Sequence, residues 1–133
     1  MKNTGIKLIF TLRGFYKTLS KLIIDMENRT FAFIKTDKKL VKLFFKDITI
    51  IKGLGNYVEI NTTSHKKYIY YKALKDLIES LPDEFMRVHN SYIVNLTNIE
   101  YFEDNQLVCQ DQKIAVAKSY KDCLITTLDK MML

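Results

Sequence analysis

The hydrophobic pattern of the chain changes its period near residue 30. Before this point, apolar residues recur at intervals of four and three residues, which is typical of an amphipathic helix with a heptad seam. The seam consists of Leu8, Leu12, Phe15, Leu19, Leu22 and Met26, and lysine and arginine occupy the other faces. Three roles are open for this predicted helix: it packs on its own domain, pairs with a second copy, or lies on an anionic membrane.

From residue 31 onward, apolar and polar residues alternate with the period of β-strands, and polar turns or glycines separate the segments. The segments expected to form strands are Phe31–Thr36, Leu40–Phe45, Asp47–Lys52, Tyr57–Thr62, Lys67–Tyr71, Ile99–Phe102, Gln106–Gln110 and Lys113–Ala117. Residues 53–56, Gly-Leu-Gly-Asn, are expected to form a loop or bulge, because Gly and Asn tolerate positive φ.

Two helices are expected among these strands. The apolar stripe of the first consists of Leu74, Leu77, Ile78 and Leu81, and Pro82 ends it. The second is expected to begin at Ser119, with Asp122 in the capping-box position, and to bury Tyr120, Leu124, Leu128 and Met131. The sequence therefore predicts a mainly β domain over residues 31–133, preceded by a helical extension over residues 1–30.

The formal net charge of +6 is distributed unevenly between these two parts. Residues 1–30 contain six Lys or Arg against two acidic residues, which gives +4, and residues 31–133 contain fifteen against thirteen, which gives +2. If the main domain binds nucleic acid, it must therefore use local clusters of cations rather than a broad positive field.

The cysteines and the N-terminal apolar residues bear on where in the cell the protein is located. Cys109 and Cys123 form no CxxC pair, and lysine and arginine interrupt the apolar residues of the N-terminal part, unlike those of a secretory signal. We expect a cytoplasmic protein. No uncharged run approaches the roughly 20 residues of a membrane-spanning helix, and a membrane is not the expected partner.

The sequence shows no constellation of catalytic residues. It contains no HExxH, GxSxG or Gly-rich phosphate loop, and neither His65 nor His89 stands at metal-ligand spacing from a cysteine. A nucleophilic cysteine assisted by His89 is the one catalytic arrangement left. We therefore predict that the protein is not an enzyme, and we expect no cofactor, no metal and no small-molecule substrate.

The segment Arg87–Ile99 combines polar side chains with an adjacent apolar run. Its polar part contains Arg87, His89, Asn90, Ser91 and Tyr92, and its apolar part begins with Ile93-Val94. Asn can pair with an adenine edge, while Ser, Tyr and backbone amides can bond phosphate. Each Asn can instead satisfy backbone groups of a turn. We expect this structural role for Asn95 and Asn98, which flank apolar residues.

Several segments of residues 31–130 also resemble a known family when they are taken together. They are Phe33–Thr36, Asp47–Ile60, Leu74–Leu77 with Leu81-Pro82, Phe85–Leu96 and Ile114–Lys121. In this order and spacing they resemble the LytTR-type DNA-binding domain of bacterial transcription regulators. The resemblance implies a mainly β fold, an elongated arrangement of small antiparallel sheets with short helices, whose loops enter the major groove.

The resemblance also implies which residues contact DNA. One contact falls on Asn56, a second on Asn90 with His89 and Ser91 beside it, and a third on Lys118. We assign Arg87 to phosphate contacts or packing. These sites are expected to lie along one edge of the domain, and the side chains that read bases are expected in successive major grooves.

Two features depart from the family pattern. Many members carry Arg where this chain has Lys118, and Lys lacks the planar fork that bonds guanine twice, so a phosphate contact is expected there. Many members also begin with a phosphoacceptor receiver domain, as response regulators do. Residues 1–30 are too few to fold as a receiver, and phosphorylation control is not supported.

The expected function is sequence-specific binding of double-stranded DNA and regulation of transcription, with two copies of the chain, a possible homodimer, on repeated half-sites. The alternative is a β-rich module that binds a protein or a membrane through the basic N-terminal helix.

Overall fold

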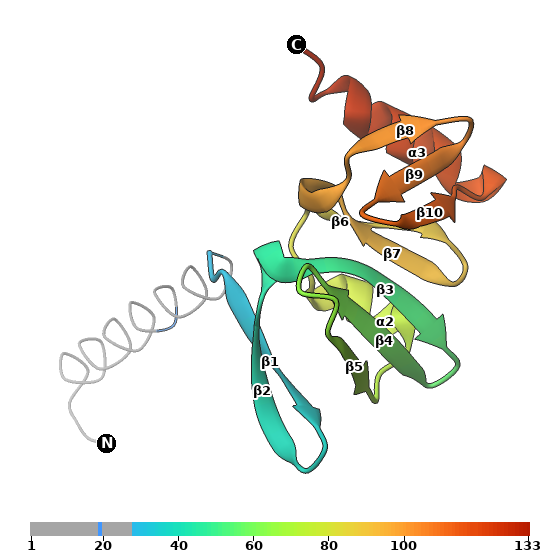
Figure 1. Ribbon diagram of the computed structural model, residues 1–133. Helices are drawn as coiled ribbons and strands as arrows, with labels where there is room; N and C mark the ends of the chain where they lie inside the picture. Colours follow the sequence, from blue (N-terminus) through green and yellow to red (C-terminus); the bar gives the residue numbers. More distant parts are fainter. Residues whose placement is uncertain (1–18, 20–27) are drawn as a thin grey trace, which may run out of the picture. The chain divides into compact units, whose positions relative to one another are not determined.

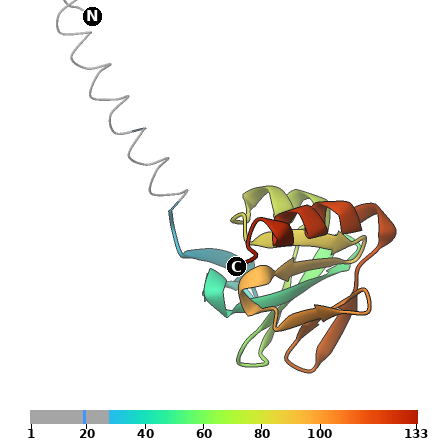
Figure 2. The ribbon, with the colours of Figure 1, turned by 90° about the horizontal axis from the view of Figure 1, so that it is seen from above.

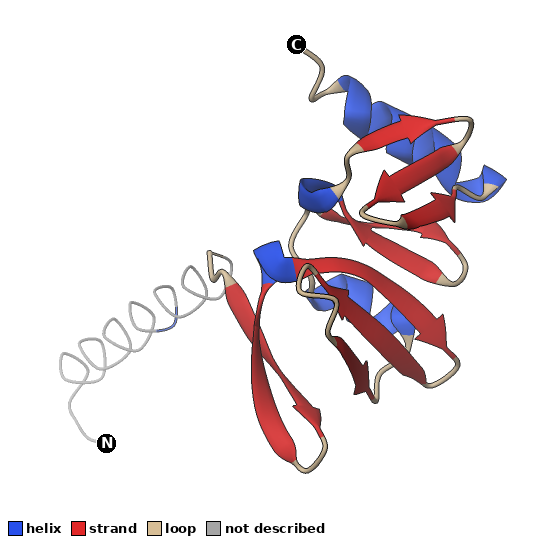
Figure 3. Cartoon of the chain, in the orientation of Figure 1, coloured by secondary structure: helices blue, strands red, loops and turns tan. Residues whose placement is uncertain are grey.

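The computed structural model describes Leu19 and residues 28–133. The predicted seam helix lies outside the described residues, apart from Leu19. Residues 31–133 form a single unit made mainly of strands with a few short helices (Figure 3). No helix in the described part of the chain is long and apolar enough to cross a membrane.

The alternating segments form ten strands in residues 31–133 (Figure 1). The strands are β1 (Phe31–Thr36), β2 (Lys39–Phe44), β3 (Ile48–Leu54), β4 (Tyr57–Thr62), β5 (Lys67–Tyr70), β6 (Phe85–His89), β7 (Tyr92–Asn95), β8 (Tyr101–Glu103), β9 (Gln106–Cys109) and β10 (Gln112–Ala115). The helices are α2 (Leu74–Leu77) and α3 (Lys118–Asp129), with 3-10 turns at Phe45–Asp47, Ile78–Ser80 and Leu96–Asn98.

The strands pair antiparallel in three small sheets. The hairpin β1-β2 forms the first, the order β10-β9-β8 the second, and the order β5-β4-β3-β7-β6 the third. This arrangement confirms the predicted fold class.

Two apolar cores lie on opposite faces of the five-stranded sheet. Ile50 and Ile51 are neighbours on β3, and they point into different cores because successive side chains of a strand alternate in direction. The Ile51 core also contains residues of α2 and of the hairpin β1-β2, such as Leu74 and Ile34. The Ile50 core contains residues of the three-stranded sheet and of α3, such as Leu107 and Leu124. The five-stranded sheet is therefore the central layer, with α2 and the hairpin β1-β2 packed on one face and the three-stranded sheet and α3 packed on the other.

The segment Phe85–Asn95 forms a β-hairpin that the sequence pattern did not predict. Strands β6 and β7 pair with a register shift between Arg87 and His89. The inside–outside division of the segment is nevertheless confirmed, because Ile93 and Val94 are fully buried and Asn90 is exposed. The loop predicted at residues 53–56 is shorter than expected. Gly53 and Leu54 belong to β3, so that only Gly55 and Asn56 form the turn.

The last helix differs from its prediction at both ends. Its N-cap is Ala117, no side chain caps it, and Ser119 lies inside α3, so the predicted capping box is wrong. The amide of Ala117 instead donates to the carbonyl of Val88, which fixes the start of α3 against β6. Met131 is 60% exposed rather than buried, because it follows the end of the helix.

Candidate nucleic-acid interface

Three segments that are far apart in the sequence meet at one edge of the unit (Figures 1 and 2). They are the β3–β4 turn, the β6–β7 turn and the start of α3. The two turns are neighbours because β3 pairs with β7. The Gly53 amide donates to the Ser91 carbonyl at 2.8 Å, and the Ala117 amide donates to the Val88 carbonyl at 2.9 Å. These backbone bonds join the three segments into what we call the turn edge.

The β3–β4 turn presents Asn56 to solvent. Leu54 pairs with Tyr57, so Gly55 and Asn56 are the two central residues of the turn. Gly55 has a φ of +71°, and glycine at the first central position is typical of a type II′ turn. Asn56 is exposed at the tip of this hairpin. The turn chemistry thus places a carboxamide beyond the end of the sheet.

The β6–β7 turn organises His89 through a backbone bond. The amide of Ser91 donates to Nδ1 of His89 at 3.0 Å. An Nδ1 atom that accepts a hydrogen bond carries no proton, so the neutral imidazole carries its proton on Nε2. His89 can therefore offer an N–H donor to a ligand without giving up its bond to the turn.

Asn90 is exposed at the same turn and is held by its side-chain oxygen. The hydroxyl of Tyr120, on the first turn of α3, donates to Oδ1 of Asn90 at 3.1 Å. This bond uses none of the Nδ2 donors, and a carbonyl oxygen has a second lone pair. The carboxamide of Asn90 is therefore oriented and retains both donor and acceptor capacity, as paired contact with an adenine edge requires.

Arg87 holds the β6–β7 turn through a hydrogen bond to its backbone. Its guanidinium donates to the carbonyl of Asn90 at 2.7 Å and lies 5.9 Å from the centre of the Tyr120 ring. Its Nε atom is buried without a hydrogen-bond partner in the described part of the chain. These contacts are those of a packing residue, which is one of the two roles expected for Arg87.

Lys118 is the first residue of α3 and is exposed. It follows Ala117, whose amide is bonded to β6. The start of a helix also carries a positive partial charge from its unpaired amides. The turn edge therefore has a cationic position beside the two carboxamide turns.

Asn95 and Asn98 have the structural role that the sequence predicted. Asn95 is 0% exposed, and its Nδ2 donates to the carbonyls of Phe45 and Ile48 at 2.9 and 2.8 Å. The amide of Thr97 donates to Oδ1 of Asn95 at 3.1 Å. Asn98 donates to the carbonyls of Lys46 and Ile48. Both side chains hold the turn Phe45–Asp47 in place.

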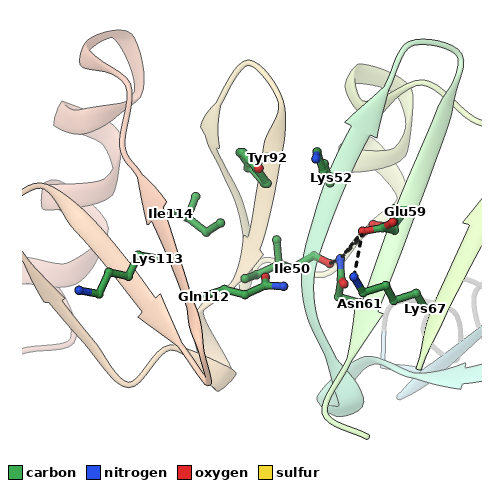
Figure 4. A pocket seen from close by; sticks show the side chains of 9 residues that line it. All are labelled: Ile50, Lys52, Glu59, Asn61, Lys67, Tyr92, Gln112, Lys113 and Ile114. Atoms are coloured by element: carbon green, nitrogen blue, oxygen red, sulfur yellow. Dashed lines mark hydrogen bonds and ion pairs between the residues drawn. The ribbon is translucent and has the colours of Figure 1, made fainter. Parts of the chain in front are cut away.

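A polar cleft of about 270 Å³ lies between the five-stranded sheet and the β9–β10 hairpin (Figure 4). Its residues are Ile50, Lys52, Glu59, Asn61, Lys67, Tyr92, Gln112, Lys113 and Ile114. Lys67 lies 3.9 Å from Glu59, and Asn61 bonds the same carboxylate. Gln112 points into the cleft while Lys113 points away from it (Figure 4). The carboxylate of Glu59 is therefore engaged by Lys67 and Asn61, while Lys52 and Lys113 add two further cationic groups to the lining.

Of the two cysteines, Cys109 does not have the surroundings of a nucleophile. Cys109 is 1% exposed, and burial, followed by the nearby Glu100 carboxylate, raises the pKa of its thiol. Its side chain packs in the Ile50 core, whereas His89 lies at the β6–β7 turn. A raised pKa disfavours the thiolate that a nucleophile requires.

The sequence did not predict the roles of Tyr120 and Gly53 at this edge. Tyr120 was expected to be buried, yet its hydroxyl bonds Asn90. A Cβ on Gly53 would lie 3.4 Å from Leu74 and 3.7 Å from the Ser91 carbonyl, so the backbone there is closely packed. The position of Tyr120 two residues after Lys118, within the segment that resembles a known family, was the available signal.

Comparison with known proteins gives a family match and a match to a solved structure. The model of the LytTr DNA-binding domain family matches residues 38–129. No curated protein matches the chain. Among solved structures, the chain is similar to the LytTr DNA-binding domain of a protein described as a methyl-accepting/DNA response regulator from Bacillus cereus. The identity is 20% over 76% of this chain and 98% of that chain, and the TM-score of 0.65 indicates the same fold.

Proposed function

Because this chain belongs to the LytTr DNA-binding domain family, we propose that it binds double-stranded DNA sequence-specifically through the turn edge and thereby regulates transcription. The observation that carries the proposal is the hydrogen-bonded junction of the β3–β4 turn, the β6–β7 turn and the start of α3. The junction supports a rigid surface from which short side chains contact a duplex. The family match favours this reading over an interaction module that acts through the N-terminal helix.

The residues of the turn edge divide between base contacts and phosphate contacts. Asn56 and Asn90 read base edges with their carboxamides, and His89 donates from Nε2 to a base or phosphate acceptor. Ser91 and Lys118 bond phosphate, because hydroxyls and ammonium groups serve as single-point contacts. Arg87 acts by holding the β6–β7 turn, as its bond to the Asn90 carbonyl supports.

The spacing of the turns limits how they meet DNA. The β3–β4 and β6–β7 turns are two strand spacings apart in the sheet, which is about 10 Å. A full turn of B-DNA is about 34 Å. Asn56 and Asn90 therefore contact the same turn of the duplex, in place of the successive major grooves expected from the resemblance. Lys118 follows on the β6 side of the edge and extends the contact.

Two copies of the chain bind repeated half-sites in a bacterial cytoplasm. Each domain carries only a short row of base-reading side chains, so a second copy is needed to reach the specificity of a genomic operator.

The experiment is selection of bound fragments from a random DNA pool by the full chain, followed by titration of the recovered fragment at several salt concentrations. We expect one repeated motif to be enriched, and binding to weaken as salt rises. Recovery of fragments without a shared motif would contradict sequence-specific binding.

A further inference from the structure

The hairpin β1-β2 has one face in the core and one face in solvent. Ile34 and Leu43 are buried in the Ile51 core, with Ala32 and Val41 beside them. The register pairs Phe31 with Phe44, Phe33 with Lys42, and Lys35 with Leu40, so these six side chains share the opposite face. We call this opposite face the hairpin face.

The hairpin face exposes large apolar side chains. Phe33 is 56% exposed, Leu40 is 69% exposed and Phe44 is 40% exposed. The ring of Phe31 packs edge-on against Phe33 and Phe44, at centroid distances of 6.0 and 6.2 Å. The three phenylalanine rings thus form one cluster across both strands, with Leu40 exposed on the same face, and such an apolar surface marks an interaction site.

Two lysines, Lys35 and Lys42, share the hairpin face with this apolar cluster. The Lys42 ammonium lies 4.2 Å from the Phe31 ring centre and 4.9 Å from that of Phe44. The turn between the strands has two consecutive residues of positive φ, Asp37 and Lys38, as a type I′ turn does. Residues 31–44 contain four lysines and one aspartate, a net charge of +3. The hairpin face itself therefore combines its apolar contact area with two of these lysines, Lys35 and Lys42.

Exposed apolar side chains beside lysines favour an anionic lipid surface as the partner, rather than a second copy of the chain or duplex DNA. A second copy of the chain would bring the lysines of two hairpin faces together, and like charges repel in an apolar interface. Duplex DNA would neutralise the lysines but leave Phe33 and Leu40 without apolar contact. An anionic lipid surface accepts both groups, because aromatic and aliphatic side chains enter the acyl boundary while lysines remain at the headgroups.

We propose that the hairpin face docks on a membrane surface rich in anionic phospholipid. This proposal departs from the sequence-based expectation that a membrane is not the partner, because the sequence pattern of β1 and β2 predicted only a hairpin of the main domain. The hairpin lies beside β5, at the opposite end of the five-stranded sheet from β6 and α3 (Figure 1). The turn edge therefore stays accessible when the hairpin face is occupied, and the regulator can be held near the membrane with DNA bound.

The experiment is flotation of the full chain with vesicles of phosphatidylcholine containing roughly 30% phosphatidylglycerol, compared with vesicles of phosphatidylcholine alone. We expect binding only to the anionic vesicles, and weaker binding as salt rises. The double substitution Phe33→Ser and Leu40→Ser should weaken this binding at least about tenfold, because it removes most of the apolar insertion.

A matched control is the double substitution Ile69→Ser and Tyr71→Ser, which removes exposed apolar groups of similar size from and beside β5. It should leave vesicle binding unchanged, and circular dichroism should show folded protein for both variants. Absence of wild-type binding to anionic vesicles would overturn the proposal. So would unchanged binding in the hairpin variant, equal losses in both variants, or a loss of self-association in the hairpin variant by sedimentation. None of these outcomes depends on recognition of DNA by the turn edge.

Discussion

Asn90 and Asn95 stand near the two ends of β7, and their surroundings are opposite. Asn95 is 0% exposed, and three hydrogen bonds engage both ends of its carboxamide. Asn90 is exposed, and one bond from Tyr120 holds its side-chain oxygen. The same side chain therefore serves stability where its bonding capacity is filled inside the protein, and at the surface its capacity remains available for the contact that we propose with DNA.

Removal of the buried carboxamide should have the largest effect on folding. Asn95→Ala leaves the carbonyls of Phe45 and Ile48 and the amide of Thr97 without this partner in a buried site. We expect the free energy of unfolding to fall by about 2–4 kcal/mol, measured by urea denaturation. A loss below about 0.5 kcal/mol would contradict the structural role of Asn95.

Removal of the exposed carboxamide should show the reverse pattern. Asn90→Ala should weaken cognate DNA binding by about 1–3 kcal/mol and leave non-specific binding nearly unchanged. Its effect on unfolding should stay within about 0.5 kcal/mol, because Asn90 is at an exposed turn. Titrations with cognate and scrambled duplexes provide the measurement.

Gln110→Ala is the matched control for the exposed carboxamide. Gln110 is also an exposed carboxamide at a hairpin turn, between β9 and β10, and its side chain bonds the Thr63 carbonyl. It should leave both kinds of DNA binding unchanged. Equal losses of cognate and scrambled binding in Asn90→Ala would show that Asn90 does not read bases.

The strands were predictable where the side chains alternate strictly. In β4, Val58 and Ile60 point inward and Tyr57 and Glu59 point outward, so period two is visible in the sequence. In β6 the buried residues are Phe85 and Val88, which are three positions apart and point into different cores on opposite faces of the sheet. Because both faces of β6 are covered, its apolar residues do not alternate with polar ones, and periodicity alone therefore does not reveal such a strand.

The turn edge was predictable in its residues but not in its connections. Chemical type and family resemblance were sufficient to select Asn56, Asn90 and Lys118. The bonds that join their segments are made by backbone amides of Gly53 and Ala117, and any residue but proline has such an amide. Tyr120 was misassigned because its place in the apolar stripe of a helix is compatible with both a buried ring and a ring at the edge of the core.

Loss of the Lys118 cation should weaken DNA binding less than loss of the Asn90 carboxamide. Lys118→Ala should reduce the slope of the logarithm of the binding constant against the logarithm of salt concentration by about 1, and weaken binding at physiological salt by roughly fivefold. The loss should be equal for cognate and scrambled duplexes. A loss confined to the cognate duplex would indicate that Lys118 reads a base.

The smallest expected effect concerns the bond that distinguishes Asn90 from a free surface Asn. Tyr120→Phe removes the hydroxyl that donates to Oδ1 of Asn90 at 3.1 Å, and keeps the ring that faces the Arg87 guanidinium. The carboxamide then samples more rotamers before binding, and ordering it costs free energy at the moment of DNA contact. We expect cognate affinity to fall by roughly two- to fivefold, with unchanged scrambled binding.

The double variant with Asn90→Ala tests whether this effect passes through Asn90. If Tyr120 acts only by orienting that side chain, Tyr120→Phe should cause no further loss of cognate affinity when Asn90 is already Ala. Additive losses would mean that the Tyr120 hydroxyl contacts DNA itself. A gain in cognate affinity for the single variant would mean that Tyr120 and an adenine amino group compete for the same oxygen of Asn90.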